Sequence, residues 1–251
     1  MSGYQIRFLY DGAALLLYSR AKRHLVLGDL HLGLERKLHE RGVHIYSMAE
    51  HMAGQIKALA ERGKTGSVIL LGDIKESIMY PDAAERSSID EFFRLLGGLD
   101  VRIAAGNHDG HLAELVKARI DNEIIIGNVA MLHGHMWPSE EAMTKDYIVV
   151  AHNHVAVSFR DENGALYNQR AWLVAKVDQS GARRRYKTFN VNAKLIVMPA
   201  FNDLIIGKAV NELEGNHINP LFRNMIFDYK NADIYSMDGS ILGTPSSLAG
   251  R

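Results

Sequence analysis

The chain of 251 residues contains no cysteine. This absence excludes disulfides, thiolate metal sites, iron–sulfur clusters and cysteine nucleophiles. It is also typical of proteins from a reducing compartment, so we expect a cytoplasmic location. Any metal or acid–base site must then be built from nitrogen and oxygen donors, and the sequence offers 12 histidines beside its acidic residues.

Long apolar runs, linkers and an excess of one charge are missing too. No run approaches the roughly 20 apolar residues of a membrane-spanning helix, so we expect no membrane partner. Only five prolines occur and no low-complexity tract or repeat divides the chain, which predicts a single domain over 1–251. Basic and acidic residues number 29 each, for a net charge of +0. This balance argues against a surface built as a whole to hold polyanions, although a local basic strip remains compatible with it.

What the sequence does contain is a succession of short apolar runs that end in polar clusters. The runs expected to form strands are 24–28, 67–71, 101–105, 124–132 with a turn at 127–128, and 147–151. Helical periodicity lies between them at 46–60 and 89–96. Alternating strands and helices, with polar residues at the carboxyl ends of the strands, are typical of an α/β fold.

The second part of the chain, 155–251, is expected to be mostly β. Its predicted strands are 155–159, 171–177, 186–191 and 195–198, followed by a hairpin over 232–242. Combined with the first part, this pattern predicts a four-layer α/β/β/α sandwich, in which two stacked mixed β-sheets are flanked by helices.

Residues with chemical potential gather behind the five strands of the first part. The clusters, in chain order, read GDLHLG, LLGDIKE, AAGNHDG, MLHGHMW and VAHNHV. Any one of them alone would be an ordinary polar loop. Because the carboxyl ends of parallel strands lie along one edge of a sheet, five such clusters together predict one crevice.

The donors in these clusters suit divalent metal ions. The candidate ligands are Asp29, His31, Asp73, Asn107, His133, His152 and His154. Imidazole and carboxylate favour Mn, with Fe, Zn and Ni as alternatives and Mg less suited. Side chains two apart on an extended segment point the same way, so each D-x-H or H-x-H pair can chelate one ion. Seven ligands are enough for two ions that share a carboxylate, and two ions with a bridging hydroxide between them predict hydrolysis of a phosphoester.

In this order, the motifs D-x-H, GD, GNH[DE], HGH and H-x-H resemble those of the calcineurin-like metallophosphoesterase superfamily over about residues 24–154. Further blocks at 31–43, 198–211 and 219–243 resemble a narrower group, the archaeal and bacterial predicted phosphoesterases related to SbcD-type repair nucleases. The resemblance implies the calcineurin-like fold, two metal ions and phosphodiester hydrolysis, with a DNA nuclease as one form of that activity.

The resemblance also implies a role for each ligand. One ion would be held by Asp29, His31 and His154, and the other by Asn107, His133 and His152, with Asp73 as the bridge.

His108 would be the general acid or transition-state stabiliser at the leaving oxygen, with Asp109 orienting and polarising it. The chain departs from the GD-x-x-D of many relatives, since Lys75 and Glu76 follow Asp73. We expect Glu76 to support the site from outside the ligands and Lys75 to contact substrate phosphate; the alternative for both is a solvated helix start.

Three more residues are candidates for substrate contacts. Arg183 and Arg185, in the basic run 183–185, would share one face of an expected strand and contact nucleic-acid phosphates. The alternative is a solvated hairpin whose charges protect an edge strand. His135 and the nearby Trp137 would line the pocket floor or stack on a base, while packing is the alternative for Trp137.

The sequence thus predicts a dinuclear phosphodiesterase whose partner is a phosphoester, nucleic acid included. One alternative is a phosphatase or phosphodiesterase acting on a small nucleotide or metabolite, which the neutral net charge and the lack of a long DNA-capping domain keep open. Another is a non-catalytic binding or scaffold module with the same fold, which the presence of His108 disfavours. The sequence does not indicate an oligomeric state.

Overall fold

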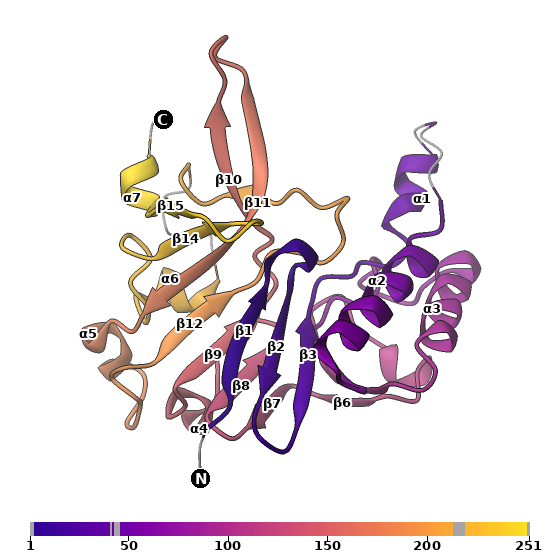
Figure 1. The fold of residues 1–251 in the computed structure, drawn as a ribbon, viewed down its shortest axis with the longest axis horizontal. Helices are drawn as coiled ribbons and strands as arrows, with labels where there is room; N and C mark the ends of the chain where they lie inside the picture. The colour runs from indigo at the N-terminus through magenta and orange to yellow at the C-terminus, as the bar shows by residue number, and fades with distance from the viewer. Residues whose placement is uncertain (1–2, 41, 43–45, 213–218, 250–251) are drawn as a thin grey trace.

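Two β-sheets lie face to face in the computed structural model, which describes residues 3–40, 42, 46–212 and 219–249 (Figure 1). The first sheet has six strands in the order β1-β2-β3-β4-β5-β6. These strands are β1 (Gln5–Leu9), β2 (Ala14–Tyr18), β3 (Arg23–Leu27), β4 (Ser67–Leu70), β5 (Asp100–Ala104) and β6 (Arg119–Asp121). β3, β4, β5 and β6 are parallel, and β1 and β2 extend the sheet as antiparallel neighbours.

The second sheet has nine strands, seven of them in the order β13-β10-β11-β12-β9-β8-β7, with β14 on β11 and β15 on β14. The strands are β7 (Glu123–Ile126), β8 (Val129–Leu132), β9 (Tyr147–Val150), β10 (Val155–Arg160), β11 (Leu166–Lys176), β12 (Lys194–Val197), β13 (Lys208–Ala209), β14 (Asp233–Ser236) and β15 (Ile241–Gly243). β8, β9 and β12 are parallel, so this sheet is mixed as well.

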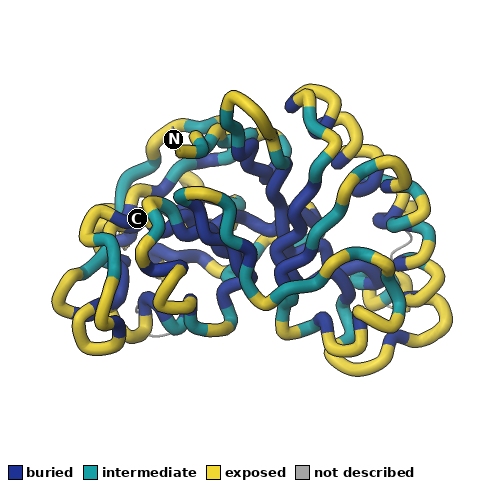
Figure 2. The backbone as a smooth tube through the Cα atoms, turned by 90° about the horizontal axis from the view of Figure 1, so that it is seen from below, coloured by how far each residue is buried: buried dark blue, intermediate teal, exposed yellow. Residues whose placement is uncertain are grey.

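The alternation of side chains along the strands separates three layers of core. Val129, Met131 and Val149 point toward the first sheet, where they pack with Val26 and Ile69. Their neighbours along β8 and β9 point the other way and pack against short helices, namely α4 (Glu140–Met143), α5 (Gln179–Arg183), α6 (Pro220–Arg223) and α7 (Pro245–Leu248). Figure 2 shows that buried residues gather in the interior of the molecule, whereas exposed residues lie along its periphery.

The outer face of the first sheet is covered by α2 (Met48–Gly63) and α3 (Ala83–Leu95). Ile56 of α2 and Phe92 of α3 are fully buried there. Ser47 caps α2, and Asp82 caps α3 by accepting from the backbone N–H groups of Ala84 and Glu85. The shorter α1 (Leu34–His39) precedes α2, and the end of the 31–43 block, at residues 41 and 43, lies outside the described residues. The predicted four-layer α/β/β/α arrangement is therefore confirmed.

One predicted strand, 186–191, is wrong. Residues 179–183 form α5, which Asp178 begins by accepting a hydrogen bond from Gly181 N–H. Tyr186 continues this turn through its N–H to Ala182, and its buried ring donates from its hydroxyl to the Pro138 carbonyl. The apolar residues that suggested a strand are thus anchors of an irregular segment.

Among the residues described, no helix has the length and apolar composition that crossing a membrane would take.

Candidate metal centre

The carboxyl ends of strands from both sheets meet at one place in the fold. β3, β4 and β5 deliver the Asp29, Asp73 and His108 loops from the first sheet, whereas β8 and β9 deliver His133 and His152 from the second. The expectation that one sheet carries all five loops is therefore wrong. The loops converge because the two sheets are stacked. His133, which follows β8 of the second sheet, contacts the first sheet through its Nδ1, 2.8 Å from the Leu71 carbonyl.

Two groups of converging donors share the Asp73 carboxylate. The first contains Asp29, His31, Asp73 and His154, and the second Asp73, His133 and His152; within each group one donor atom per residue lies within 4.8 Å of the others. Asp29, Asp73, His31 and His133 are buried, with at most 4% of their surface exposed. Six of the seven predicted ligands therefore come together in the structure.

The seventh, Asn107, lies in the turn before His108 and is exposed. The backbone N–H of His108 donates to Asp73 Oδ1 at 2.9 Å, which keeps this turn beside the shared carboxylate. The assignment of Asn107 as a ligand stays a prediction.

At the centre of the site, imidazole nitrogens and a carboxylate oxygen that can each bind a proton or a cation lie close together. A carbonyl only accepts, so His133 carries its proton on Nδ1 toward Leu71. Its Nε2 then lies 3.2 Å from Asp73 Oδ2 and 3.1 Å from His152 Nδ1. In the other group, His31 Nε2 lies 3.3 Å from His154 Nε2 and 3.5 Å from Asp73 Oδ2. Such an arrangement needs added protons or cations among the donors, so the residues fit divalent ions.

The pKa values of the second group also indicate that positive charge is stabilised at this site. Burial acts to lower the pKa of His133, but the hydrogen bond to Asp73 and the negative charges of Asp29 and Asp73 raise it to about 9. The pKa of Asp73 falls despite its burial, because His133 and the His108 N–H stabilise the carboxylate. Burial and the charge of His133 lower the pKa of His152 to about 4. In the metal-free protein at neutral pH, His133 is therefore the protonated, positively charged histidine of the second group.

Five of the converging residues have left-handed backbone conformations. The φ angles are 58° at Asp29, 44° at His31, 50° at Asp73, 70° at His152 and 44° at His154. The extended D-x-H and H-x-H segments expected from the sequence are thus wrong, although the side chains still converge. Each such residue costs about 1–3 kcal/mol of strain and persists only where its surroundings hold it.

The surroundings hold these loops through the backbone. Asp29 N–H donates to Gly72 and His31 N–H to Asp73, so the β3–β4 ladder continues past the strands. Glycine permits the tight contact beside it: a Cβ on Gly106 would collide with the N and Oδ1 of Asp73, and one on Gly72 would lie 2.7 Å from His133 Nδ1. Larger residues at either position would displace Asp73 or His133.

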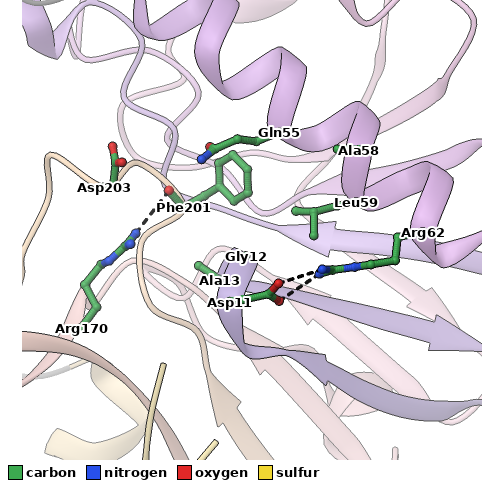
Figure 3. Close-up of a pocket in the computed structure, with 10 residues that line it drawn as sticks. All are labelled: Asp11, Gly12, Ala13, Gln55, Ala58, Leu59, Arg62, Arg170, Phe201 and Asp203. Carbon is green, nitrogen blue, oxygen red and sulfur yellow. Dashed lines mark hydrogen bonds and ion pairs between the residues drawn. The ribbon is translucent and has the colours of Figure 1, made fainter. Parts of the chain in front are cut away.

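Asn202 supports the Asp29 loop from the second sheet, a role that the sequence did not reveal. Its fully buried side chain donates to the Leu30 carbonyl at 2.8 Å, and the Phe201 N–H donates to the Gly28 carbonyl. Figure 3 shows the far side of this segment, where Arg170 and Phe201 line a cavity of about 300 Å³ and Arg170 points at the Phe201 carbonyl. Arg170 also donates to the Ala200 carbonyl at 2.9 Å. The 198–211 block was recognisable in the sequence, but the target of Asn202 lies 172 residues away.

His108 lies at the rim of the first group, with a partner other than the predicted one. Its Nδ1 is 2.6 Å from the Glu76 carbonyl, so this nitrogen carries a proton and Nε2 remains for a ligand or substrate. The buried Asp109 accepts from the backbone N–H groups of Ile74 and Gly106, at 2.8 and 2.7 Å. The prediction that Asp109 orients the His108 ring is wrong, because both of its oxygens hold the backbone of the two loops.

Lys75 and Glu76, the last two residues of the GDIKE segment, have different contacts in the structure. The Glu76 carboxylate lies 2.8 Å from His31 Nδ1 and pairs with Lys37, so it supports a candidate ligand as expected. Lys75 is fully buried and its ammonium donates to the carbonyls of Ser77, Ile78 and Met79. The predicted contact of Lys75 with substrate phosphate is wrong, since its three protons are already used inside the protein.

The remaining substrate candidates lie outside the strands, His135 after β8 and the two arginines at the end of α5 and just after it. The His135 ring centre is 5.3 Å from that of His133, so His135 does lie beside the site. Arg185 is exposed and stacks over Trp137 at 3.8 Å, whereas Arg183 is the last residue of α5. The shared strand face expected for the two arginines is wrong, because 183–185 is not a strand; their contacts with substrate stay predictions.

Comparisons with known proteins agree with the fold. No family model matches the chain, and no curated protein matches it in sequence. Among solved structures, a nuclease MPE from Pseudomonas putida superposes with a TM-score of 0.60 at 16% identity, over 95% of this chain and all of that one. An uncharacterized Streptococcus pneumoniae protein described as a predicted phosphoesterase has a TM-score of 0.31 at 11% identity, over 87% of this chain and 91% of that one. The chain therefore shares the fold of the Pseudomonas nuclease.

Proposed function

We propose that this protein is a phosphoesterase that hydrolyses phosphodiesters with the help of two divalent metal ions. The observation that carries the proposal is that Asp73 belongs to both groups of converging donors. A carboxylate can serve two cations at once, which a site for a single ion does not require. Two such ions, when bound, supply an activated water and offset the charge of the reacting phosphate.

The chain would divide its residues between holding the ions and moving a proton. One ion would be held by Asp29, His31 and His154, and the other by Asn107, His133 and His152, with Asp73 shared. His108 keeps one proton on Nδ1 through the Glu76 carbonyl, so a second proton on Nε2 can be donated to the leaving oxygen. Asp109 serves this step indirectly by fixing the backbone of the His108 loop.

A nucleic acid is the substrate class we propose first, and the fold shared with the Pseudomonas nuclease supports it. A small nucleotide or metabolite is the second candidate, because the net charge of +0 provides no general attraction for polyanions. A series of salt concentrations separates the two, since binding of a polyanion weakens steeply as salt rises.

The test compares bis-p-nitrophenyl phosphate with p-nitrophenyl phosphate after chelation and reconstitution with Mn. We expect metal-dependent cleavage of the diester by the wild type and its collapse in Asp73→Asn, with fewer ions bound. In His108→Ala we expect kcat to fall by about 10² to 10⁴ while both ions stay bound, as for loss of a general acid. Asp100→Asn, an exposed carboxylate at the opposite end of β5, is the matched control and should keep full activity.

Two outcomes would contradict the proposal. Turnover by Asp73→Asn at the wild-type rate would exclude a shared carboxylate. Metal binding without hydrolysis of any diester would favour a non-catalytic module with this fold.

Three further assignments belong to the same proposal. Manganese is the ion we propose first, because the donors are nitrogen and oxygen without sulfur. A single domain over 1–251 is supported by the shared core between the two sheets, in which Val26 of the first packs with Met131 of the second. A cytoplasmic location stays a prediction of the sequence.

A further inference from the structure

A short apolar loop lies directly beside His108. Residues 77–80, here called the platform loop, connect Glu76 to the short segment before α3. Three consecutive side chains of this loop face solvent: Ile78 is 60% exposed, Met79 68% and Tyr80 54%. Scattered apolar residues are normal on a protein surface, but three in succession next to a candidate catalytic group call for a binding function.

The backbone of the platform loop is fixed on both sides. Lys75 donates to the carbonyls of Ser77, Ile78 and Met79 from below. The buried carboxylate of Glu85 accepts from the N–H groups of Glu76 and Ser77, at 2.9 and 2.8 Å. The loop is thus preorganised: its polar backbone is satisfied inside the protein while its apolar side chains remain outside.

Contacts with residues 108–111 set the position of the loop. The carbonyl of Glu76, the residue before the loop, accepts from His108 Nδ1. The Ile78 carbonyl lies so close to Gly110 that a Cβ on this glycine would be 2.9 Å from it. The Tyr80 ring stacks on His111 with the centres 3.8 Å apart and the planes at 22°. One ring face of Tyr80 is occupied by His111, which holds the phenol in place while over half of the side chain remains exposed.

We infer that the platform loop binds the base of the nucleoside on the leaving-oxygen side of the scissile phosphodiester. This inference rests on the proposed function, in which His108 donates its proton to the leaving oxygen. The group attached to that oxygen must then lie on the His108 side of the metal centre, where the loop stands. Residues 77–80 carry no charge, so they suit the flat apolar face of an unpaired base better than a phosphate. Lys75 and Glu85 act as positioning residues for this surface.

The experiment compares a deoxydinucleotide that has both bases with two analogues, each lacking the base on one side of the phosphate. For Tyr80→Ala and Ile78→Ala we expect KM for the complete dinucleotide to rise about tenfold to a hundredfold, as for loss of stacking on one base, with kcat nearly unchanged. The wild type should show a similar rise for the analogue without the leaving-side base, and little change for the other. Ile241→Ala, which removes an equally exposed side chain (69%) from β15, is the matched control.

A binding measurement separates failure of the inference from failure of the proposed function. A dinucleotide with 2-aminopurine on the leaving side should lose fluorescence when it stacks on wild-type protein, with or without turnover, and this quenching should vanish in Tyr80→Ala. Both variants should bind metal ions in equilibrium dialysis with the wild-type stoichiometry, which would show that the metal centre is intact. Equal KM values for wild type and variants, or quenching that survives in Tyr80→Ala, would overturn the inference even if the protein is a phosphodiesterase.

Discussion

Metal binding to this protein should release a proton from His133. In the metal-free protein its pKa is raised to about 9, since Asp73 and Asp29 outweigh the effect of burial. A histidine must give up its proton to coordinate a metal through Nε2. The perturbation is therefore simple: metal is added to the metal-free protein at several pH values.

The magnitude follows from this pKa. At pH 7.5 a group with a pKa of about 9 is neutral in only about 3% of molecules, which costs the metal about 2 kcal/mol of binding free energy. Affinity should therefore rise about eightfold from pH 7.5 to 8.5, because the neutral fraction rises to about 24%. His152, with a pKa of about 4, is already neutral there and should contribute no proton. The release should thus be close to one proton for the second ion site.

Isothermal titration in two buffers of different ionisation enthalpy measures this proton directly. At pH 7.5 the heats of binding in the two buffers should differ by about the difference in their ionisation enthalpies, as expected for the release of one proton. The control variant His51→Gln, which replaces a histidine of α2, should leave that difference unchanged. Equal heats in both buffers, together with one affinity at pH 7.5 and 8.5, would refute the reasoning about His133.

Further predictions concern stability and the support of the ligands. In the metal-free protein, the raised pKa of His133 stabilises the fold below pH 6.5 and this contribution is lost as the pH rises through about 9, so the gain in Tm on adding metal should widen from pH 6.5 to 8.5. Glu76→Gln should weaken metal binding about tenfold to a hundredfold in equilibrium dialysis, because His31 loses its carboxylate partner, whereas Glu61→Gln on α2 should not. Gly106→Ala should destabilise the protein by about 1–3 kcal/mol in urea and displace Asp73, whereas Gly54→Ala, with open space around it, should not destabilise it. Asn202→Ala should cost about 1–3 kcal/mol in the same assay, because the Leu30 carbonyl loses its buried donor.

The fold could be predicted from local patterns because most of its strands have a clear sequence signature. Runs such as 67–71 and 147–151 combine β-branched residues with an abrupt polar end, and the structure places β4 and β9 there. The prediction failed at 186–191, where Tyr186 and Phe189 are apolar for a different reason. They fill the core beside α5 without pairing with a strand, and a single sequence does not distinguish the two uses of an apolar residue.

The candidate site was predictable in its members but not in its geometry. The order of the motifs identified the donors that the structure brings together around Asp73. It could not show that Asp109 binds backbone N–H groups instead of the His108 ring, or that Lys75 is buried under three carbonyls. Such contacts depend on where a loop turns after its strand, and here the turns use left-handed conformations that non-glycine residues rarely adopt.

Those conformations also explain how the site coexists with a stable fold. Left-handed residues at Asp29 and Asp73 would each cost about 1–3 kcal/mol if nothing held them. Both carboxylates accept a backbone N–H from a different loop, Asp29 from His152 at 3.0 Å and Asp73 from His108 at 2.9 Å. The same two side chains therefore close the loops on each other and present their charge to the converging imidazoles. Since the bonds that fix them come from the chain, the donors are positioned before any ion arrives, and binding free energy need not be used to fold the site.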